Sequence, residues 1–158
     1  QHPIILHNSP SGAVERVIYA LLEKSAMQIK DGKIPQFPLW LAPIQVRLIP
    51  LKDDFLEFAS NLASKLTEQN IRVDIDDRND TIGKRIRDAE KEWINYVLVI
   101  GEKEVNSSSL SVRDRSTGNV RQLSIEDFVK EIKDATNGKP ISKLNSAILL
   151  SKRPQIMV

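Results

Sequence analysis

Hydrophobic and polar residues alternate along the chain with two different periods. Apolar residues recur every three to four positions in four stretches, a spacing typical of helices with one buried face. Five shorter runs are apolar or alternate with period two, as expected of strands. The predicted helices span 14–30, 55–69, 81–92 and 125–135, and the predicted strands span 44–50, 71–75, 96–100, 110–115 and 120–123.

The order of these segments predicts an α/β fold. Strand, helix, strand, helix and strand are followed by a hairpin around Gly118 and a last helix. We therefore expect a mixed, mostly parallel five-stranded sheet with helices on both faces. A short strand over 1–6 and the helix over 14–30 precede it. Ligands of such sheets favour the carboxyl ends of the parallel strands, here residues 76–80 and 101–104.

Three regions are expected along the chain. Residues 1–34 carry the first helix, and residues 35–43 read as an extended linker because prolines interrupt them. The main domain is then predicted over 44–158, with a tail of undefined structure after Gly138. Because the chain opens on Gln1 in the middle of a pattern, we interpret it as part of something longer.

Composition narrows the classes of partner. The net charge is only +2, so binding of nucleic acid would have to depend on a local patch. The chain has no cysteine, which removes disulfides and thiolate metal sites. Its apolar runs are too short to cross a bilayer, so no membrane association is expected.

The predicted helix over 81–92 has a basic side. Lys84, Arg87 and Lys91 fall on one side and the apolar residues on the other. Alone, this pattern is that of an ordinary solvated face. Asn79 at the preceding strand end and Arg113 in the hairpin are expected to converge on the same side. Asn and Arg carry fixed donor and acceptor groups that suit the edges of unpaired RNA bases.

Other sites are less well supported. Four aspartates between residues 74 and 80 lack the spacing of a calcium loop, and Arg72 and Arg78 are expected to neutralise them, so we assign them to helix capping and local pairing. No phosphate-binding loop motif or GxSxG occurs. His2 and His7 are the only histidines and cannot complete a zinc shell without cysteine.

Two stretches resemble one enzyme family. HNSPSGAVER, residues 7–16, is similar to motif 3 of the class II aminoacyl-tRNA synthetases. FPLWLAPIQV, IRVDIDDRNDTIGKRIRDAE, YVLVIGEKEV and SVRDR resemble, in order, the anticodon-binding domain of the threonyl-tRNA synthetase family in its archaeal form. The resemblance extends to about residue 132. It implies the end of a catalytic domain over 1–34 and an anticodon-binding domain over 44–158.

The resemblance also implies roles for single residues. Arg16 matches the motif 3 arginine that contacts ATP. His7 matches a zinc ligand whose two partners would lie upstream. Asn79, Arg87, Glu104 and Arg113 match residues that contact the anticodon, whose last two bases, G and U, are common to threonine tRNAs. A carboxylate such as Glu104 suits the donor edge of guanine, and Arg113 suits acceptor oxygens.

The implied parent protein is a cytoplasmic, homodimeric threonine–tRNA ligase that uses ATP and zinc. The chain alone is expected to bind threonine tRNA, to hold neither ATP nor zinc, and to be inactive without the rest of the catalytic domain. Three alternatives stay open. They are a separate tRNA-binding or regulatory module that reuses the fold, the anticodon domain of a prolyl, histidyl or glycyl relative, and a small-molecule binder at the carboxyl edge of the sheet.

Overall fold

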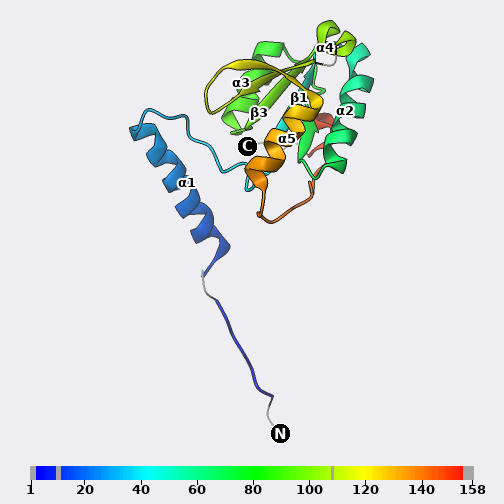
Figure 1. Cartoon of the computed structure of the whole chain (residues 1–158). Coiled ribbons are helices and arrows are strands. Elements are labelled where there is room, and N and C mark those ends of the chain that lie inside the picture. Colours follow the sequence, from blue (N-terminus) through cyan, green and yellow to red (C-terminus); the bar gives the residue numbers. More distant parts are fainter. Residues whose placement is uncertain (1–2, 10–11, 108, 155–158) are drawn as a thin grey trace. The chain divides into compact units, whose positions relative to one another are not determined.

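The structure, a computed structural model, describes residues 3–9, 12–107 and 109–154. The chain divides into two compact units, Gln1–Pro35 and Gln36–Val158. Figure 1 shows the order of their helices and strands along the chain. Among the described residues, no helix combines the length and the apolar character needed to cross a membrane.

Among its described residues, the first unit contains one helix, α1 (Val14–Lys30). Its apolar stripe is largely exposed, and Ile18 is 49% accessible. The strand expected over residues 1–6 is wrong for the part that the structure describes, because residues 3–9 have no regular structure. A strand needs a hydrogen-bonded neighbour, and the β-prone residues Ile4 and Ile5 have none among the described residues.

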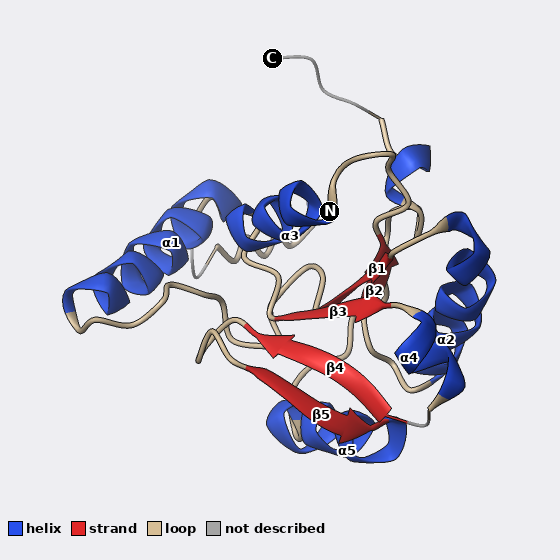
Figure 2. Cartoon of the chain, turned by 90° about the horizontal axis from the view of Figure 1, so that it is seen from above, coloured by secondary structure: helices blue, strands red, loops and turns tan. Residues whose placement is uncertain are grey.

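The second unit is built on one five-stranded sheet with the order β2-β1-β3-β4-β5. The strands are β1 (Val46–Pro50), β2 (Val73–Ile75), β3 (Tyr96–Ile100), β4 (Ser109–Asp114) and β5 (Val120–Ser124). Strand β1 pairs in parallel with β2 and β3, and β4 is antiparallel to both of its neighbours. Figure 2 shows the five strands side by side. The mixed sheet predicted from the sequence is confirmed.

Helices cover the two faces unequally. α2 (Leu56–Glu68) and α5 (Ile125–Thr136) supply one face with its large core, in which Leu66, Phe128 and Ile132 pack against inward-facing strand residues such as Leu48 and Leu98. α3 (Ile82–Lys91) covers part of the other face through a smaller apolar cluster. A short helix, α4 (Glu102–Asn106), and two 3-10 turns, η1 (Asp53–Phe55) and η2 (Leu150–Lys152), complete the unit.

Local sequence signals explain several helix boundaries. Thr81 caps α3 by accepting a hydrogen bond from the Lys84 N–H. Asn70, with a φ of 62°, ends the α2 region in the left-handed conformation, which asparagine adopts more readily than most residues. Asp53 and Asp54 precede α2 and are of a residue type that commonly caps helices, but a 3-10 turn leads into this helix and no side chain caps it. The sequence analysis missed α4, since five residues are too few to show a helical period.

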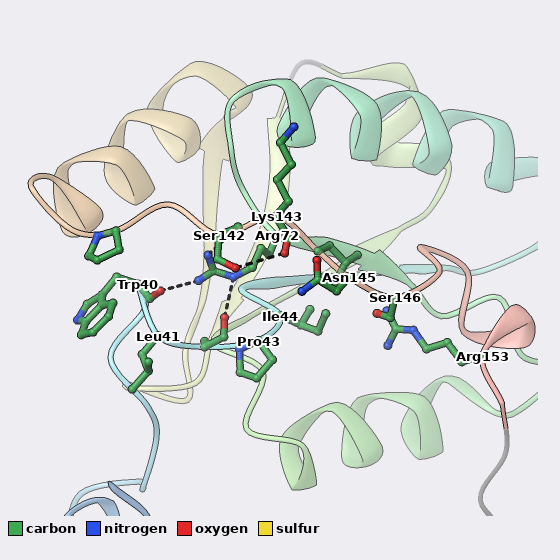
Figure 3. A pocket seen from close by; sticks show the side chains of 13 residues that line it. Trp40, Leu41, Pro43, Ile44, Arg72, Ser142, Lys143, Asn145, Ser146 and Arg153 are labelled. Atoms are coloured by element: carbon green, nitrogen blue, oxygen red, sulfur yellow. Dashed lines mark hydrogen bonds between the residues drawn. The ribbon is translucent and has the colours of Figure 1, made fainter. Parts of the chain in front are cut away.

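The segment expected as a linker packs within the second unit. Arg72 is buried and donates to backbone carbonyl oxygens of Trp40, Ala42 and Ser142 (Figure 3). It also donates to the Leu39 carbonyl oxygen. These bonds tie residues 39–42 and the tail to the start of β2. The sequence had suggested instead that Arg72 neutralises the aspartates, and the structure contradicts that suggestion.

Candidate nucleic-acid interface

Strands β4 and β5 expose one face of the sheet. Val97 of β3 points toward α3, where it packs with Ala89 and Ile86. In the strand register Arg113 lies opposite Val97, so Arg113 points to the same side. Ser111, two positions away, shares that side because side chains alternate along a strand. We call Ser111, Arg113, Val120 and Gln122 the open face.

The open face is accessible because α3 packs on the neighbouring strands. The apolar cluster beneath α3 draws its strand residues from β1 and β3. On β5, Val120 is 54% exposed and Gln122 is exposed as well. Residues of β4 and β5 that point the other way, such as Leu110 and Val112, are buried in the large core. One side of this hairpin thus packs and the other presents polar groups to solvent.

A hydrogen-bond network orders one end of the open face. Glu104 accepts a hydrogen bond from the Gly101 N–H at 3.1 Å and another from the Ser111 hydroxyl. Gln122 donates to the Ser111 oxygen at 2.7 Å and accepts from the Ser109 hydroxyl at 2.9 Å. The face therefore has a fixed arrangement of donors and acceptors before any ligand arrives.

Glu104 has two structural tasks in this network. Its bond to the Gly101 N–H satisfies a free amide at the start of α4, and the side chain is only 7% exposed overall. An added Cβ at Gly101 would lie 2.8 Å from Leu51 Cδ1, so a larger residue there would displace the Leu51 side chain. Each carboxylate oxygen of Glu104 retains acceptor capacity. The residue predicted to meet the anticodon is thus held rigidly at the end of the open face.

Arg113 of the open face reaches toward α3, the helix that carries Arg87. The Arg113 guanidinium is 3.8 Å from a Glu90 carboxylate oxygen, with 37% of its side chain exposed. Arg87 lies three residues before Glu90, on the adjoining part of the helix surface, and is exposed. Among the residues that the structure describes, Arg87 has no ion-pair partner. Both guanidinium groups are accessible to a ligand on the open face.

Asn79 occupies a different end of this region. It lies after β2, two residues before the cap of α3, and it is exposed. Glu90, the partner of Arg113, belongs to the last turns of α3, and ten helical residues span about 15 Å. Asn79 and Arg113 therefore lie at opposite ends of α3, although the sequence had suggested that they converge. Arg87 lies between these two ends.

Of the four aspartates between residues 74 and 80, Asp76 and Asp80 pair locally as the sequence predicted, whereas Asp74 and Asp77 bond to residues far away in the sequence. Asp76 is buried and bonds to the Arg78 guanidinium, which also reaches Asp88. Burial of Asp76 acts to raise its pKa, but the bonds from Arg78 outweigh burial and hold this pKa below its ordinary value. Asp80 pairs with Lys84 at 2.7 Å. No group of three or more metal-binding side chains forms within the described ranges.

The two residues of the first unit that the sequence singled out are exposed. Arg16 lies in the first turn of α1, beside Gly12, whose φ is 69°. His7 lies in the irregular segment that precedes α1. Among the described residues, His7 belongs to no group of three or more metal-binding side chains.

Sequence reasoning missed Ser111 and Gln122. Their signal was present in the alternation of SLSVRD, where serine, serine and arginine share one side of the strand and leucine and valine the other. That pattern predicts a half-exposed strand. The pattern did not reveal that no helix would pack over the polar side of this strand, because the position of a helix depends on the whole sheet.

Comparison with known proteins defines the class. The family model described as "Anticodon binding domain" matches residues 45–135, more than half of the chain. The chain therefore belongs to the anticodon-binding-domain family. The matched residues include β1 through β5 and hence the whole open face.

Relatives of the whole chain are threonine–tRNA ligases. The ligase of Nitrosopumilus maritimus is 66% identical over all 158 residues, and that of Cenarchaeum symbiosum is 54% identical. The ligase of Pyrococcus furiosus is 49% identical over 155 residues. The chain spans only 25–26% of the length of these curated relatives.

A solved structure supports the fold assignment. The crystal structure of the RNA binding domain of threonyl-tRNA synthetase from Cryptosporidium parvum Iowa II matches with a TM-score of 0.60 and 25% identity. The match covers 68% of this chain and 26% of that one. Mixed α/β architecture and membership of the anticodon-binding family are thus supported by sequence and by structure.

Proposed function

We propose that residues 36–154 bind the anticodon loop of threonine tRNA, as the tRNA-recognition part of a threonine–tRNA ligase. The observation that carries this proposal is the open face of β4 and β5, which is at least partly exposed, is mostly polar, and includes Arg113, with Arg87 on the neighbouring α3. Family membership and the identity to threonine–tRNA ligases support the choice of tRNA.

The chemistry of the open face suits unpaired bases. Anticodon bases lie in a loop and can be splayed onto a protein surface, where side chains reach their hydrogen-bonding edges. Gln122 and Ser111 offer both donors and acceptors, and the Arg113 guanidinium offers a planar set of donors. Glu104 supplies a carboxylate beside them that fits the donor edge of guanine. We propose that Arg113 and Glu104 contact the two bases that all threonine anticodons share.

Residues outside the open face have complementary roles in this proposal. Arg87 on α3 reaches a base edge or a phosphate, while Asn79 contacts the loop at the far end of the helix. The net charge of +2 is too small for strong non-specific attraction. Recognition must therefore depend on a few directed contacts, and the salt dependence of binding should be correspondingly shallow.

The first unit fits the same parent protein. We propose that the rest of a class II catalytic domain covers the apolar stripe of α1, which exposes Val14, Ile18 and Ile29. In that protein Arg16 would contact ATP, and His7 would join two further ligands around zinc. The proposed parent reaction activates threonine with ATP and transfers it to tRNA in the cytoplasm, in a homodimer.

A titration tests the proposed function. The chain is mixed with fluorescent anticodon stem-loops at one fixed salt concentration, because affinities for nucleic acid are comparable only at the same salt concentration. One stem-loop carries a threonine anticodon, a second replaces its middle G, and a third replaces its final U. Each replacement should weaken binding by about 1–3 kcal/mol. Equal affinity for the three stem-loops would refute base recognition.

A further inference from the structure

The tail of the chain returns to the sheet and covers its free edge. After α5 the chain passes to β2, which is the outer strand of the sheet. The Ile75 N–H donates to the Ile148 carbonyl oxygen at 2.9 Å, and Leu149 forms a parallel bridge with Ile75. Leu149 also packs against the large core. These contacts give the backbone of the edge strand a hydrogen-bond partner, and covering an edge strand is a common structural role for a tail.

Beyond Leu149 the tail makes a contact that edge protection does not require. The Asp77 carboxylate accepts hydrogen bonds from both the backbone N–H and the hydroxyl of Ser151, at the 3-10 turn η2 (Leu150–Lys152). Arg153 stabilises this turn from the other side. It pairs with buried Asp74 at 2.9 Å and donates to the Ala147 carbonyl oxygen. The turn is therefore clamped onto the segment that follows β2.

The clamped segment carries Asn79. On either side of Asn79 the charged side chains are occupied: Arg78 by Asp76 and Asp88, and Asp80 by Lys84. Asn79 itself is exposed. Its side chain makes no hydrogen bond to the part of the chain that the structure describes. The loop thus presents the free side-chain amide of Asn79, and the bonds from Ser151 to Asp77 join this loop to the tail.

We propose that Ser151 is a positioning residue for anticodon binding, which through Asp77 holds the loop of Asn79 in the conformation that meets the tRNA. This inference rests on the proposed function and extends it to the tail, which lies outside the matched family model. A loop that is ordered before binding does not have to be ordered by the ligand, so it binds more tightly with the same contacts.

The experiment is a double-mutant cycle on the 158-residue chain. Four proteins are compared: the unchanged chain, Ser151→Ala, Asn79→Ala and the variant with both changes. Ser146→Ala is the matched control, because Ser146 is an exposed serine of the same tail and makes no hydrogen bond to the described residues. Affinity for the threonine anticodon stem-loop and for the two base-replaced stem-loops is measured, together with the thermal midpoint.

Ser151→Ala should weaken binding of the threonine anticodon by about three- to tenfold, the cost of immobilising a loop side chain on binding. Asn79→Ala should also weaken binding of the threonine anticodon. Adding Ser151→Ala to Asn79→Ala should lower the affinity no further. Ser151→Thr, which retains the hydroxyl, should restore binding. Ser146→Ala should bind as the unchanged chain does.

Two results would overturn the inference. If the unchanged chain discriminates among the stem-loops and Ser151→Ala binds each of them with the affinity of the unchanged chain, the clamp has no role in binding. If the losses from Ser151→Ala and Asn79→Ala simply add, Ser151 acts on stability or elsewhere and does not act through Asn79. A chain that does not discriminate at all would instead refute the proposed function, and the inference would fall with it.

Discussion

Helices α1 and α5 have the same kind of sequence but different surroundings. Both carry apolar residues at helical spacing opposite a charged side. In α5 this stripe is buried, and Phe128 and Ile132 are 0% and 1% exposed. In α1 the corresponding residues remain accessible, with Ile18 at 49% and Ile29 at 59%. An apolar stripe therefore predicts a helix and its need for a partner, but it does not identify the partner.

The charged residues of the two helices differ in the same way. Glu131 of α5 bonds to Arg121 of β5 and to the Tyr96 hydroxyl of β3, so it joins the helix to two strands. Charged residues of α1 such as Glu23 have no ion-pair partner within the described ranges. The second unit is stabilised by its own contacts, and changes in α1 should leave it unaffected.

The largest effect should come from the buried stripe. Ile132→Ala removes side-chain atoms that contact the core of the second unit and should lower its free energy of unfolding by about 2–5 kcal/mol. Ile18→Ala, the matched change in α1, should alter it by about 0.5 kcal/mol or less. Denaturant unfolding followed by tryptophan fluorescence measures both, since Trp40 and Trp93 lie in the second unit. Similar losses in the two variants would show that α1 is part of the same cooperative core.

Removing one arginine from each unit should show that the second unit, and not the first, determines the preference for a threonine anticodon. Arg113→Ala should cost about 1–3 kcal/mol of the preference for a threonine anticodon, because the guanidinium contacts a base edge in the proposed complex. Arg16→Ala removes the same charge from α1 and should leave that preference unchanged. Stem-loop titrations measure both. A loss at Arg113 that is equal for every loop sequence would assign this arginine to the phosphate backbone.

How far the sequence alone leads can be judged from particular residues. The strand over 96–100 and the caps at Thr81 and Asn70 were predictable, because each depends on a local pattern or on one side chain. Asn79, Arg87, Glu104 and Arg113 came from resemblance to a family, and their roles stay predictions. What local patterns do not encode is which strand edge or face another segment will cover.

Two examples show that limit. The tail over 141–154 has no periodic pattern, and its bonds to Asp77 and Asp74 connect residues more than seventy positions apart. Arg72 looked like a partner for aspartates nearby in sequence, yet it binds carbonyl oxygens of residues 39–42 and Ser142. In both cases the partner is set by the completed sheet, which brings distant segments together.

The smallest effect concerns the pH dependence of stability, compared between Glu131 of α5 and Glu23 of α1. The Arg121 guanidinium, bonded to Glu131, lowers the pKa of this carboxyl below its ordinary 4.5, burial opposes the shift, and Tyr96 adds to it. Because the folded pKa is below the unfolded one, the charged form of Glu131 stabilises the fold above about pH 4.5. That contribution is lost as the pH falls through the lower, folded value.

Glu131→Gln keeps the shape of the side chain and removes this charge. The unchanged chain should therefore be more stable than the variant at neutral pH, and the difference should shrink steadily below about pH 4.5. Glu23→Gln in α1 should leave the stability of the second unit unchanged, both at neutral pH and in acid. Thermal midpoints across this pH range measure the effect for both. A difference at Glu131 that stays constant into acid would mean that the glutamine disturbs packing around Tyr96, and that the ion pair with Arg121 does not help to hold α5 on the sheet.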